Sequence, residues 1–243
     1  MIKKRGLGDY PRIYRPWTIS EIYGQEDAVT IVRNGLRKGK LPHSLLFFGA
    51  SGCGKTTMAR SIGMGLNCEN GPTDNPCLRC NVCRGILNGG HLAYREVNAA
   101  DFTGVDDMRD LRGQFACAPM DGKHQIIVFD ECHRLSVNAQ EMLLKEVEDN
   151  PAQNYFIFCS TDPEKIIDTL KNRLVPIEFS HFSDDDQRRL LQDVCISERI
   201  KNGREVLDTI IKEAGGMPRN ALSILQRAVE QENIIRSDNG QIL

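Results

Sequence analysis

The most informative residues of the chain are Gly49-Ala50-Ser51-Gly52-Cys53-Gly54-Lys55-Thr56. They match the phosphate-loop pattern GxxxxGK[ST] at every position, and they stand between an apolar run and a stretch with helical spacing. In such a loop the glycines let backbone N–H groups surround phosphate oxygens. We therefore expect the segment from Gly49 through Thr57 to hold a nucleotide, with Lys55 on the β- and γ-phosphates and the Thr56 hydroxyl on Mg²⁺. The alternative is an ordinary glycine-rich turn, which the flanking strand and helix disfavour.

A second motif, Ile126-Ile127-Val128-Phe129-Asp130-Glu131, is an apolar run that ends in two acids. A buried parallel strand would deliver both carboxylates to the same edge of the sheet as the phosphate loop. There Asp130 would act through the Mg²⁺ shell, and Glu131 would activate the attacking water as a general base. Taken alone, the motif fits a strand that ends in a solvated acidic turn. Together with the phosphate loop it predicts hydrolysis of a nucleoside triphosphate.

Apolar strands alternate with helices along the first 180 residues. Strands are predicted at 44–48, 94–98, 125–129 and 155–160, and helices near 26–38, 58–66, 105–115, 138–148 and 163–171. Continuous apolar strands between helices are typical of a parallel sheet covered on both faces. The first part of the chain is therefore predicted to be an α/β domain.

The strands stop after residue 180. Three helices are predicted at 184–199, 204–213 and 218–231, and Gly215-Gly216 separates the last two. Ser183, followed by three aspartates, is a favourable helix start because a hydroxyl cap and an acidic first turn suit the helix dipole. We expect a nucleotide-binding domain over 1–180 and a small helical lid domain over 181–243.

Four cysteines, Cys68, Cys77, Cys80 and Cys83, form the pattern C-x8-C-x2-C-x2-C. The two-residue gaps let neighbouring thiolates point at one centre, and four thiolates close a tetrahedral site, so the pattern predicts structural Zn²⁺. An iron–sulfur cluster would want a further cysteine at the position of Leu87. Chance clustering of free thiols is the alternative. We expect this module, about residues 67–86, to project from the core.

The overall composition excludes several classes of protein. The formal net charge is −2, so attraction of the whole surface to nucleic acid is not supported, and any DNA contact must use a local face. No run of about 18 apolar residues exists. The first eight residues lead into no apolar segment, unlike a secretory signal. We expect a cytoplasmic protein with no membrane contact.

Several stretches, taken together, carry a resemblance to a known family. They are the two nucleotide motifs, the cysteine insertion directly after the phosphate-loop helix, Tyr14-Arg15-Pro16, Gly24-Gln25, Leu66-Asn67-Cys68, Asp130-Glu131-Cys132-His133-Arg134-Leu135-Ser136 and Thr161-Asp162-Pro163. The chain resembles, nearly end to end, the gamma/tau family of DNA polymerase III subunits, which are the AAA+ ATPases of the bacterial clamp loader. The resemblance implies a P-loop NTPase fold of the AAA+ type with a five-stranded parallel sheet and a three-helix lid.

The resemblance also implies roles for single residues. Ile22 and Gly24 match the segment that cups the adenine, and Thr161 matches the sensor of the γ-phosphate. Arg219 matches the lid arginine that faces the nucleotide. Arg173 matches the arginine that acts on the ATP of a neighbouring subunit, although Asn172 and Leu174 differ from the family's small flanking residues. Taken without the resemblance, both arginines are interpreted as solvated side chains.

The implied function is ATP-dependent loading of a sliding clamp onto primed DNA, with ATP, Mg²⁺ and Zn²⁺ as cofactors. Partners would be the other clamp-loader subunits, the clamp and primer-template DNA, with Lys145 and Lys165 as candidate contacts to the DNA backbone. In the family a helical collar domain follows the lid and assembles a pentamer. Its place would begin near Leu243, and we expect a pentamer only if a collar is present.

Three other functions stay open at this point. Another AAA+ DNA motor, for branch migration or initiation, is disfavoured by the cysteine module. A non-hydrolysing AAA+ adaptor is disfavoured by intact Lys55, Asp130 and Glu131. A zinc-based DNA-binding module is disfavoured by the near-neutral charge and by the lack of a basic recognition helix.

Overall fold

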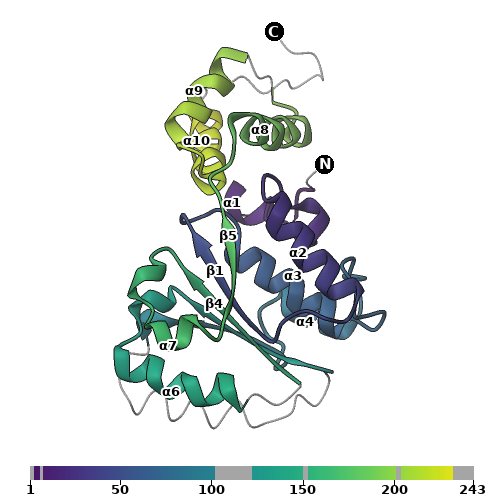
Figure 1. Ribbon diagram of the computed structural model, residues 1–243. Helices are drawn as coiled ribbons and strands as arrows, with labels where there is room; N and C mark the ends of the chain where they lie inside the picture. The colour runs from purple at the N-terminus through teal and green to yellow at the C-terminus, as the bar shows by residue number, and fades with distance from the viewer. Residues whose placement is uncertain (1–2, 6–7, 102–121, 150–152, 201–203, 232–243) are drawn as a thin grey trace.

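The chain folds into an α/β base with a group of helices at one end (Figure 1). The computed structural model describes residues 3–5, 8–101, 122–149, 153–200 and 204–231. The helix predicted at 105–115 lies outside the described residues. In the described part of the chain, no helix has both the length and the apolar character needed to cross a membrane.

The base is built on one five-stranded parallel sheet, as the resemblance implied. Its strands are β1 (Ser44–Gly49), β2 (Tyr94–Asn98), β3 (Gln125–Asp130), β4 (Asn154–Ser160) and β5 (Val175–Phe179), in the spatial order β2-β3-β4-β1-β5. Every neighbouring pair runs parallel. The central strands are buried almost throughout because helices cover both faces, which explains their continuous apolar runs in the sequence.

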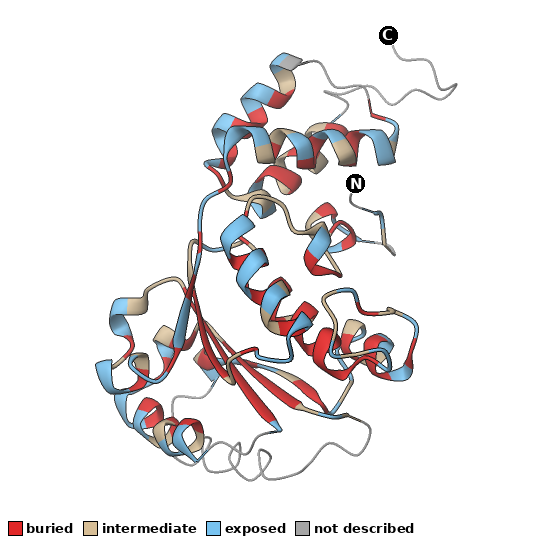
Figure 2. Ribbon diagram, turned by 45° about the vertical axis from the view of Figure 1, so that its right-hand side comes forward, coloured by how far each residue is buried: buried red, intermediate tan, exposed pale blue. Residues whose placement is uncertain are grey.

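Helices cover the two faces of this sheet (Figure 1). On one face lie α2 (Glu26–Arg37), α3 (Lys55–Asn67) and α4 (Asn81–Leu87), whose apolar residues form a single core cluster with alternate residues of β1, β3 and β4. On the other face, α6 (Val137–Glu148) and α7 (Asp168–Lys171) enclose a second cluster. Figure 2 shows the sheet as the most continuously buried part of the base. This three-layer arrangement confirms the predicted α/β class.

Three further helices form the structure that we call the lid: α8 (Asp184–Glu198), α9 (Arg204–Ala214) and α10 (Pro218–Glu230). The predicted start of α8 is confirmed, since the Ser183 hydroxyl accepts the backbone N–H of Asp186 at 3.1 Å. The lid has its own apolar cluster, which also contains Tyr10, Ile13 and Tyr14. The short N-terminal helix α1 (Tyr10–Ile13) therefore packs with the lid although it lies far from it in the sequence.

Single-turn 3₁₀ helices fill several connections. They are η1 (Ile19–Glu21), η2 (Ala99–Asp101), η3 (Cys132–Arg134) and η4 (Pro163–Lys165). The continuous helix predicted at 163–171 is wrong, because the backbone is extended at Ile166 and Ile167, between η4 and α7. The side chain of Gln140 replaces the helical hydrogen bonds there: its Oε1 accepts the N–H of Ile167 at 2.8 Å, and its Nε2 donates to the carbonyl of Lys165 at 3.2 Å.

Candidate nucleotide site and metal centre

The phosphate loop joins the end of β1 to the start of α3, as predicted. Its backbone depends on glycine at three points, since φ is +136° at Gly49, +76° at Gly52 and +109° at Gly54, a region that other residues rarely adopt. These turns lead directly into the first turn of α3. The unpaired N–H groups and the positive dipole end of α3 therefore face the cavity next to the loop, which is the arrangement that binds phosphate.

Lys55 is buried at the first position of α3. Its Nζ donates to the carbonyls of Gly49 and Ala50, each at 2.8 Å, which leaves one of the three ammonium N–H groups for a ligand. Burial lowers the pKa of Lys55, although nearby acidic groups oppose the shift. The loop carbonyls thus hold the ammonium group in place at the edge of the cavity.

The second nucleotide motif lies next to the loop. β3 is two strands from β1, with β4 between them, so the carboxyl ends of all three strands meet at one edge of the sheet. There the Thr56 hydroxyl donates to Asp130 Oδ2 at 3.0 Å. A hydroxyl and a carboxylate oxygen at this separation fit the oxygen donors that Mg²⁺ takes, so these two residues are suited to hold the ion.

Glu131 has an unusual backbone conformation for a residue other than glycine. Its φ is +53°, in the left-handed region, where strain of this kind commonly marks functional sites. The turn keeps the side chain partly exposed and in the cavity lining, and Glu131 Oε2 lies 3.4 Å from His133 Nε2. The carboxylate is therefore placed beside the loop and the Mg²⁺ ligands.

A cavity of about 400 Å³ lies between the base, the lid and the N-terminal segment. The polar end of the cavity is formed by the loop from Ser51 to Thr57 together with Asp130 and Glu131. The cavity also has apolar surface suited to a nucleobase, which comes from Ile22, Phe182, Leu190, Pro218 and Leu222. Arg219 enters from the lid and lies against the loop: a Cβ added to Gly52 would be 3.0 Å from Arg219 Cβ. Most of the predicted nucleotide residues thus converge on one cavity.

Four predicted site residues do not line this cavity: Gly24, Gly49, Thr161 and Arg173. Gly49 instead allows close packing, because a Cβ there would meet the carbonyl oxygen of Phe179 at 2.0 Å. Gly24 lies against Asp186 of the lid. Thr161 follows β4 at the same sheet edge as Asp130.

Arg173 lies at the opposite edge of the sheet. The register pairs Leu45 with Val175 and Gly49 with Phe179, so Arg173 precedes the amino end of β5 while the phosphate loop follows the carboxyl end of β1. Its guanidinium forms a salt bridge with Glu148 at the end of α6. Within one chain, Arg173 is remote from the cavity.

Arg15 and Tyr23 also line the cavity, although no sequence motif predicted a site role for them. Arg15 Nε donates to Thr57 Oγ1 at 3.0 Å, and the Tyr23 hydroxyl donates to Asp193 of the lid. Neither residue belongs to a periodic pattern or to a spaced motif. The only signal in the sequence was the family match at Tyr14-Arg15-Pro16.

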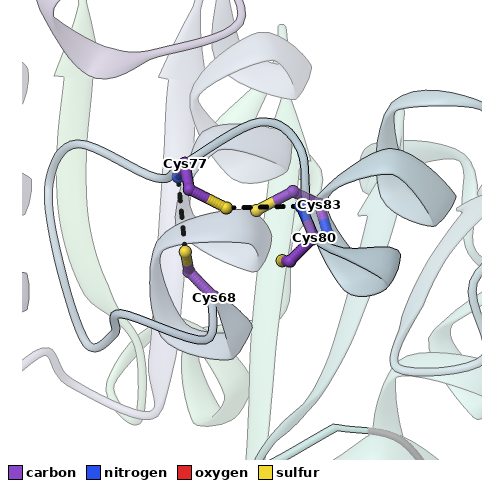
Figure 3. A group of neighbouring side chains, drawn as sticks. All are labelled: Cys68, Cys77, Cys80 and Cys83. Atoms are coloured by element: carbon purple, nitrogen blue, oxygen red, sulfur yellow. Dashed lines mark hydrogen bonds between the residues drawn. The ribbon is translucent and has the colours of Figure 1, made fainter.

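The four predicted cysteines come together in a single cluster (Figure 3). Their Sγ atoms all lie within 4.8 Å of one another, whereas four sulfurs about 2.3 Å from one Zn²⁺ would be about 3.8 Å apart. Backbone N–H groups donate to three of the sulfurs: Cys77 to Cys68 Sγ, Cys80 to Cys77 Sγ and Cys83 to Cys80 Sγ, at 3.3–3.4 Å. Hydrogen bonds to the Cys77 sulfur from the backbone N–H of Arg79, and next from that of Cys80, lower the pKa of Cys77 to about 6, which favours the thiolate that binds a metal. The cluster fits a metal ion.

The cysteine module does not project from the core, and that expectation is wrong. Cys68, Cys80 and Cys83 are buried in the same apolar cluster as α3 and β1. Asp74 fastens the module to α2 through a two-bond ion pair with Arg37, at 2.9 Å each. α3 and α4 pack against each other, and apolar residues of both helices belong to the core cluster that contains these cysteines.

The sequence from residue 24 to residue 183 matches the model of a family described as DNA polymerase III, delta subunit. This match spans more than half of the chain. The chain belongs to this family. Within the DNA polymerase III proteins, its curated relatives carry the name of a different subunit, as the resemblance had suggested.

The relatives are gamma/tau subunits. The chain is 36% identical over 218 residues to DNA polymerase III subunit gamma/tau of Mycobacterium tuberculosis, a match that covers 89% of this chain and 38% of the relative. It is 35% identical over 231 residues to the tau subunit of Escherichia coli, covering 95% and 35% respectively. For the tau subunit of Bacillus subtilis the identity is 34%, and the coverage is 90% and 39%. The chain therefore spans less than half the length of each of these three relatives.

Solved structures support the AAA+ fold of this DNA polymerase III family member. The Holliday junction branch migration motor RuvB of Thermotoga maritima aligns with a TM-score of 0.68 over 90% of this chain and 66% of that one, at 18% identity. A point variant of the same motor gives a TM-score of 0.66 at 17% identity, with the same coverage of both chains. At such identities the likeness concerns the fold alone.

Proposed function

We propose that the chain is an ATP-hydrolysing subunit of a DNA polymerase III assembly that loads a sliding clamp onto primed DNA. The observation that carries this proposal is the Thr56–Asp130 hydrogen bond, which joins the phosphate loop to the second acidic motif beside Glu131. It occurs in a chain that is 33–36% identical to gamma and tau subunits over about 90% of its length. Because primed DNA is the target, the work would take place in the cytoplasm.

In this proposal, residues of both the α/β base and the lid act on the nucleotide. Ile22, with the apolar lid residues, would enclose the adenine, and Lys55 would neutralise the β- and γ-phosphates. Thr56 and Asp130 would hold Mg²⁺, which supplies charge neutralisation at the γ-phosphate when bound. Glu131 would take the proton of the attacking water. Arg219 would contact the nucleotide and so make the position of the lid depend on which nucleotide is bound. Thr161, directly after β4, would sense the γ-phosphate.

Arg173 would serve the ATP of a neighbouring subunit. Its position at the sheet edge opposite the phosphate loop supports this, because a residue that faces away from its own site is available to another. A guanidinium supplied in this way stabilises the charge of the transition state, and in related phosphoryl transfers it contributes about 10³–10⁵ in rate. Glu148 would hold the guanidinium in position before the neighbour arrives.

Zn²⁺ is the metal that we assign to Cys68, Cys77, Cys80 and Cys83. Four thiolates leave no open position for substrate or water, so its contribution would be structural. Lys145 on α6 and Lys165 on η4 would face the DNA backbone. The Lys165 ammonium already pairs with Asp162 at 3.0 Å and is largely exposed, so a contact with DNA would have to compete with that bond.

A non-hydrolysing subunit is the second candidate. It stays open because the matched family is described by the delta subunit, a different subunit from gamma or tau. The two candidates differ in chemistry. A non-hydrolysing subunit has no use for a general base, whereas the proposed loader depends on Glu131.

The experiment measures transfer of a labelled sliding clamp onto primed DNA by the chain together with the other DNA polymerase III subunits of its own cell. ATP-dependent transfer that Glu131→Gln abolishes would support the loader. Transfer that persists unchanged in that variant would assign the hydrolysis to another subunit and favour the second candidate. No transfer by the complete wild-type assembly would refute clamp loading.

A further inference from the structure

Arg15 lies in the wall of the nucleotide cavity that the N-terminal segment provides. Its Nε donates to the hydroxyl of Thr57 at 3.0 Å, which fixes the guanidinium against the first turn of α3. The two terminal nitrogens of this guanidinium make no hydrogen bond within the part of the chain that the structure describes. Since a guanidinium carries five N–H donors in a rigid fork, most of its donor capacity is available for a ligand.

The charge of Arg15 is not balanced by the protein. Over the described ranges it forms no ion pair with a carboxylate. Burial lowers the pKa of Arg15, and the neighbouring cations Arg60 and Arg219 lower it further. Glu96 opposes this effect but is itself bound by Arg60, at 2.6 Å, and by the Tyr94 hydroxyl, at 2.7 Å. A half-buried cation in a positively charged wall is costly without a counter-charge, so its surroundings indicate an anionic ligand.

The place where Arg15 contacts α3 indicates which phosphate it would meet. Thr56 and Thr57 are successive residues and so point about 100° apart around the helix axis. Thr56 faces Asp130, at the end where Mg²⁺ and the γ-phosphate belong, whereas Thr57 faces Arg15. We propose that Arg15 binds the α-phosphate of the nucleotide and that the Thr57 hydroxyl positions its guanidinium. This inference rests on the proposed binding of ATP.

The contact would also connect the nucleotide to the lid. Arg15 directly follows Tyr14, which is buried in the apolar cluster of the lid and whose hydroxyl donates to Glu198 of α8 at 2.7 Å. The α-phosphate is present in both ATP and ADP. Arg15 therefore holds the lid against either nucleotide and does not distinguish between them, in contrast to Lys55, whose expected partners include the γ-phosphate.

The test compares the affinities of the wild type and of Arg15→Gln for ATP, ADP and adenosine by titration calorimetry and competition. We expect Arg15→Gln to lower the affinities for ATP and ADP by equal factors, about 10- to 100-fold for the loss of a charge-assisted phosphate contact. Adenosine should bind unchanged. Arg189→Gln, which removes the same charge from an exposed site on the lid, should change none of the three affinities by more than about 2-fold.

Two further variants distinguish a loss of the positioned Arg15 guanidinium from a failure of the variant protein to fold. Arg15→Lys keeps the positive charge but loses the planar guanidinium with its forked donors. Its loss of affinity for ATP and ADP should therefore be intermediate between those of the wild type and Arg15→Gln. Thr57→Val removes only the hydroxyl that holds Arg15. It should lower the affinities for ATP and ADP equally, by about 3- to 10-fold. If Arg15→Gln does not fold, as judged by its thermal unfolding without nucleotide, Thr57→Val carries the same test.

ADP with sulfur at the α-phosphate identifies the phosphate itself. The wild type should discriminate between the two sulfur diastereomers, and Arg15→Gln should lose most of that discrimination. The assignment of Arg15 would be overturned if Arg15→Gln discriminated between the diastereomers as the wild type does. It would also be overturned if this variant lost more affinity for ATP than for ADP, lost as much affinity for adenosine as for the nucleotides, or lost no affinity at all. Failure of the wild type to bind ATP at all would instead refute the proposed function on which the assignment depends.

Discussion

The cysteine module and the nucleotide cavity are assembled in opposite ways. The four cysteines lie within one short segment, at the end of α3, in the following loop and in α4, and their geometry is closed within a single chain. The cavity takes residues from the N-terminal segment, the phosphate loop, the end of β3 and the lid, which are far apart in the sequence. Its proposed trans residue, Arg173, lies at the wrong edge of the sheet to serve its own chain.

This difference is the one that we expect between a structural metal site and a catalytic site. Cys68, Cys80 and Cys83 are buried, Cys77 is partly exposed, and the four sulfurs lie within 4.8 Å of one another, so a metal held by all four would have no open position for substrate. The cavity keeps cations, the carboxylate of Asp130 and a strained Glu131 next to open space. Because α3 is about 20 Å long, its phosphate end and its cysteine end can be altered independently.

The largest effect should come from Glu131→Gln. This change removes the general base and keeps the shape of the side chain, so ATP turnover should fall by about 10²- to 10⁴-fold. ATP affinity and zinc content should stay at the wild-type level. Steady-state hydrolysis, nucleotide titration and metal analysis on the same preparations check the three values, and a parallel loss of affinity would show that Glu131 has a different role.

Lys55→Ala should abolish most nucleotide binding. It removes the ammonium group that we assign to the β- and γ-phosphates, and we expect the affinity for ATP to fall by about 100-fold or more. The zinc content of the variant should remain about one ion per chain, as expected for a closed four-thiolate site. Loss of zinc together with nucleotide would contradict the independence of the two ends of α3.

Cys80→Ser should reverse this pattern. We expect loss of zinc and a drop of about 3 kcal/mol or more in the free energy of unfolding, because the cysteines pack in the main core cluster. ATP affinity, measured below the unfolding transition, should change by less than about 3-fold, since the phosphate loop lies at the other end of α3. Ser61→Ala, a buried change on α3 outside the cluster, controls for a general loss of packing. Iron in place of zinc, or no metal in the wild type, would refute the zinc assignment.

The smallest effect concerns pH. Burial lowers the pKa of Lys55, so its ammonium begins to lose its proton at a lower alkaline pH than an ordinary lysine. ATP affinity should therefore fall by about 3-fold between about pH 7 and pH 9.5, whereas zinc stays bound because thiolates are favoured as the pH rises. Lys55→Arg, which keeps its proton in this range, should bind ATP with a flat pH profile.

The same contrast explains what could be predicted from the sequence. The cysteine spacing and the phosphate-loop pattern are local, and the structure brings their residues together as predicted. The strand β5 was not identified from the residues, because at the sheet edge its Val175 is exposed and Pro176 interrupts the apolar pattern. Arg15 was missed because only tertiary packing brings the N-terminal segment against Thr57. The packing of the cysteine module on the core was missed for the same reason.

We propose that the cysteine module is complete in one chain, whereas the nucleotide site needs a second. The most direct measurement is ATP turnover per chain over a wide range of protein concentration, for the wild type and for Arg173→Ala. We expect turnover per chain to rise with concentration, Arg173→Ala to remove most of the rise, and ATP affinity to be the same in both proteins. A high turnover that is independent of concentration and unaffected by Arg173→Ala would mean that one subunit holds the whole site and that Arg173 does not act on a neighbour.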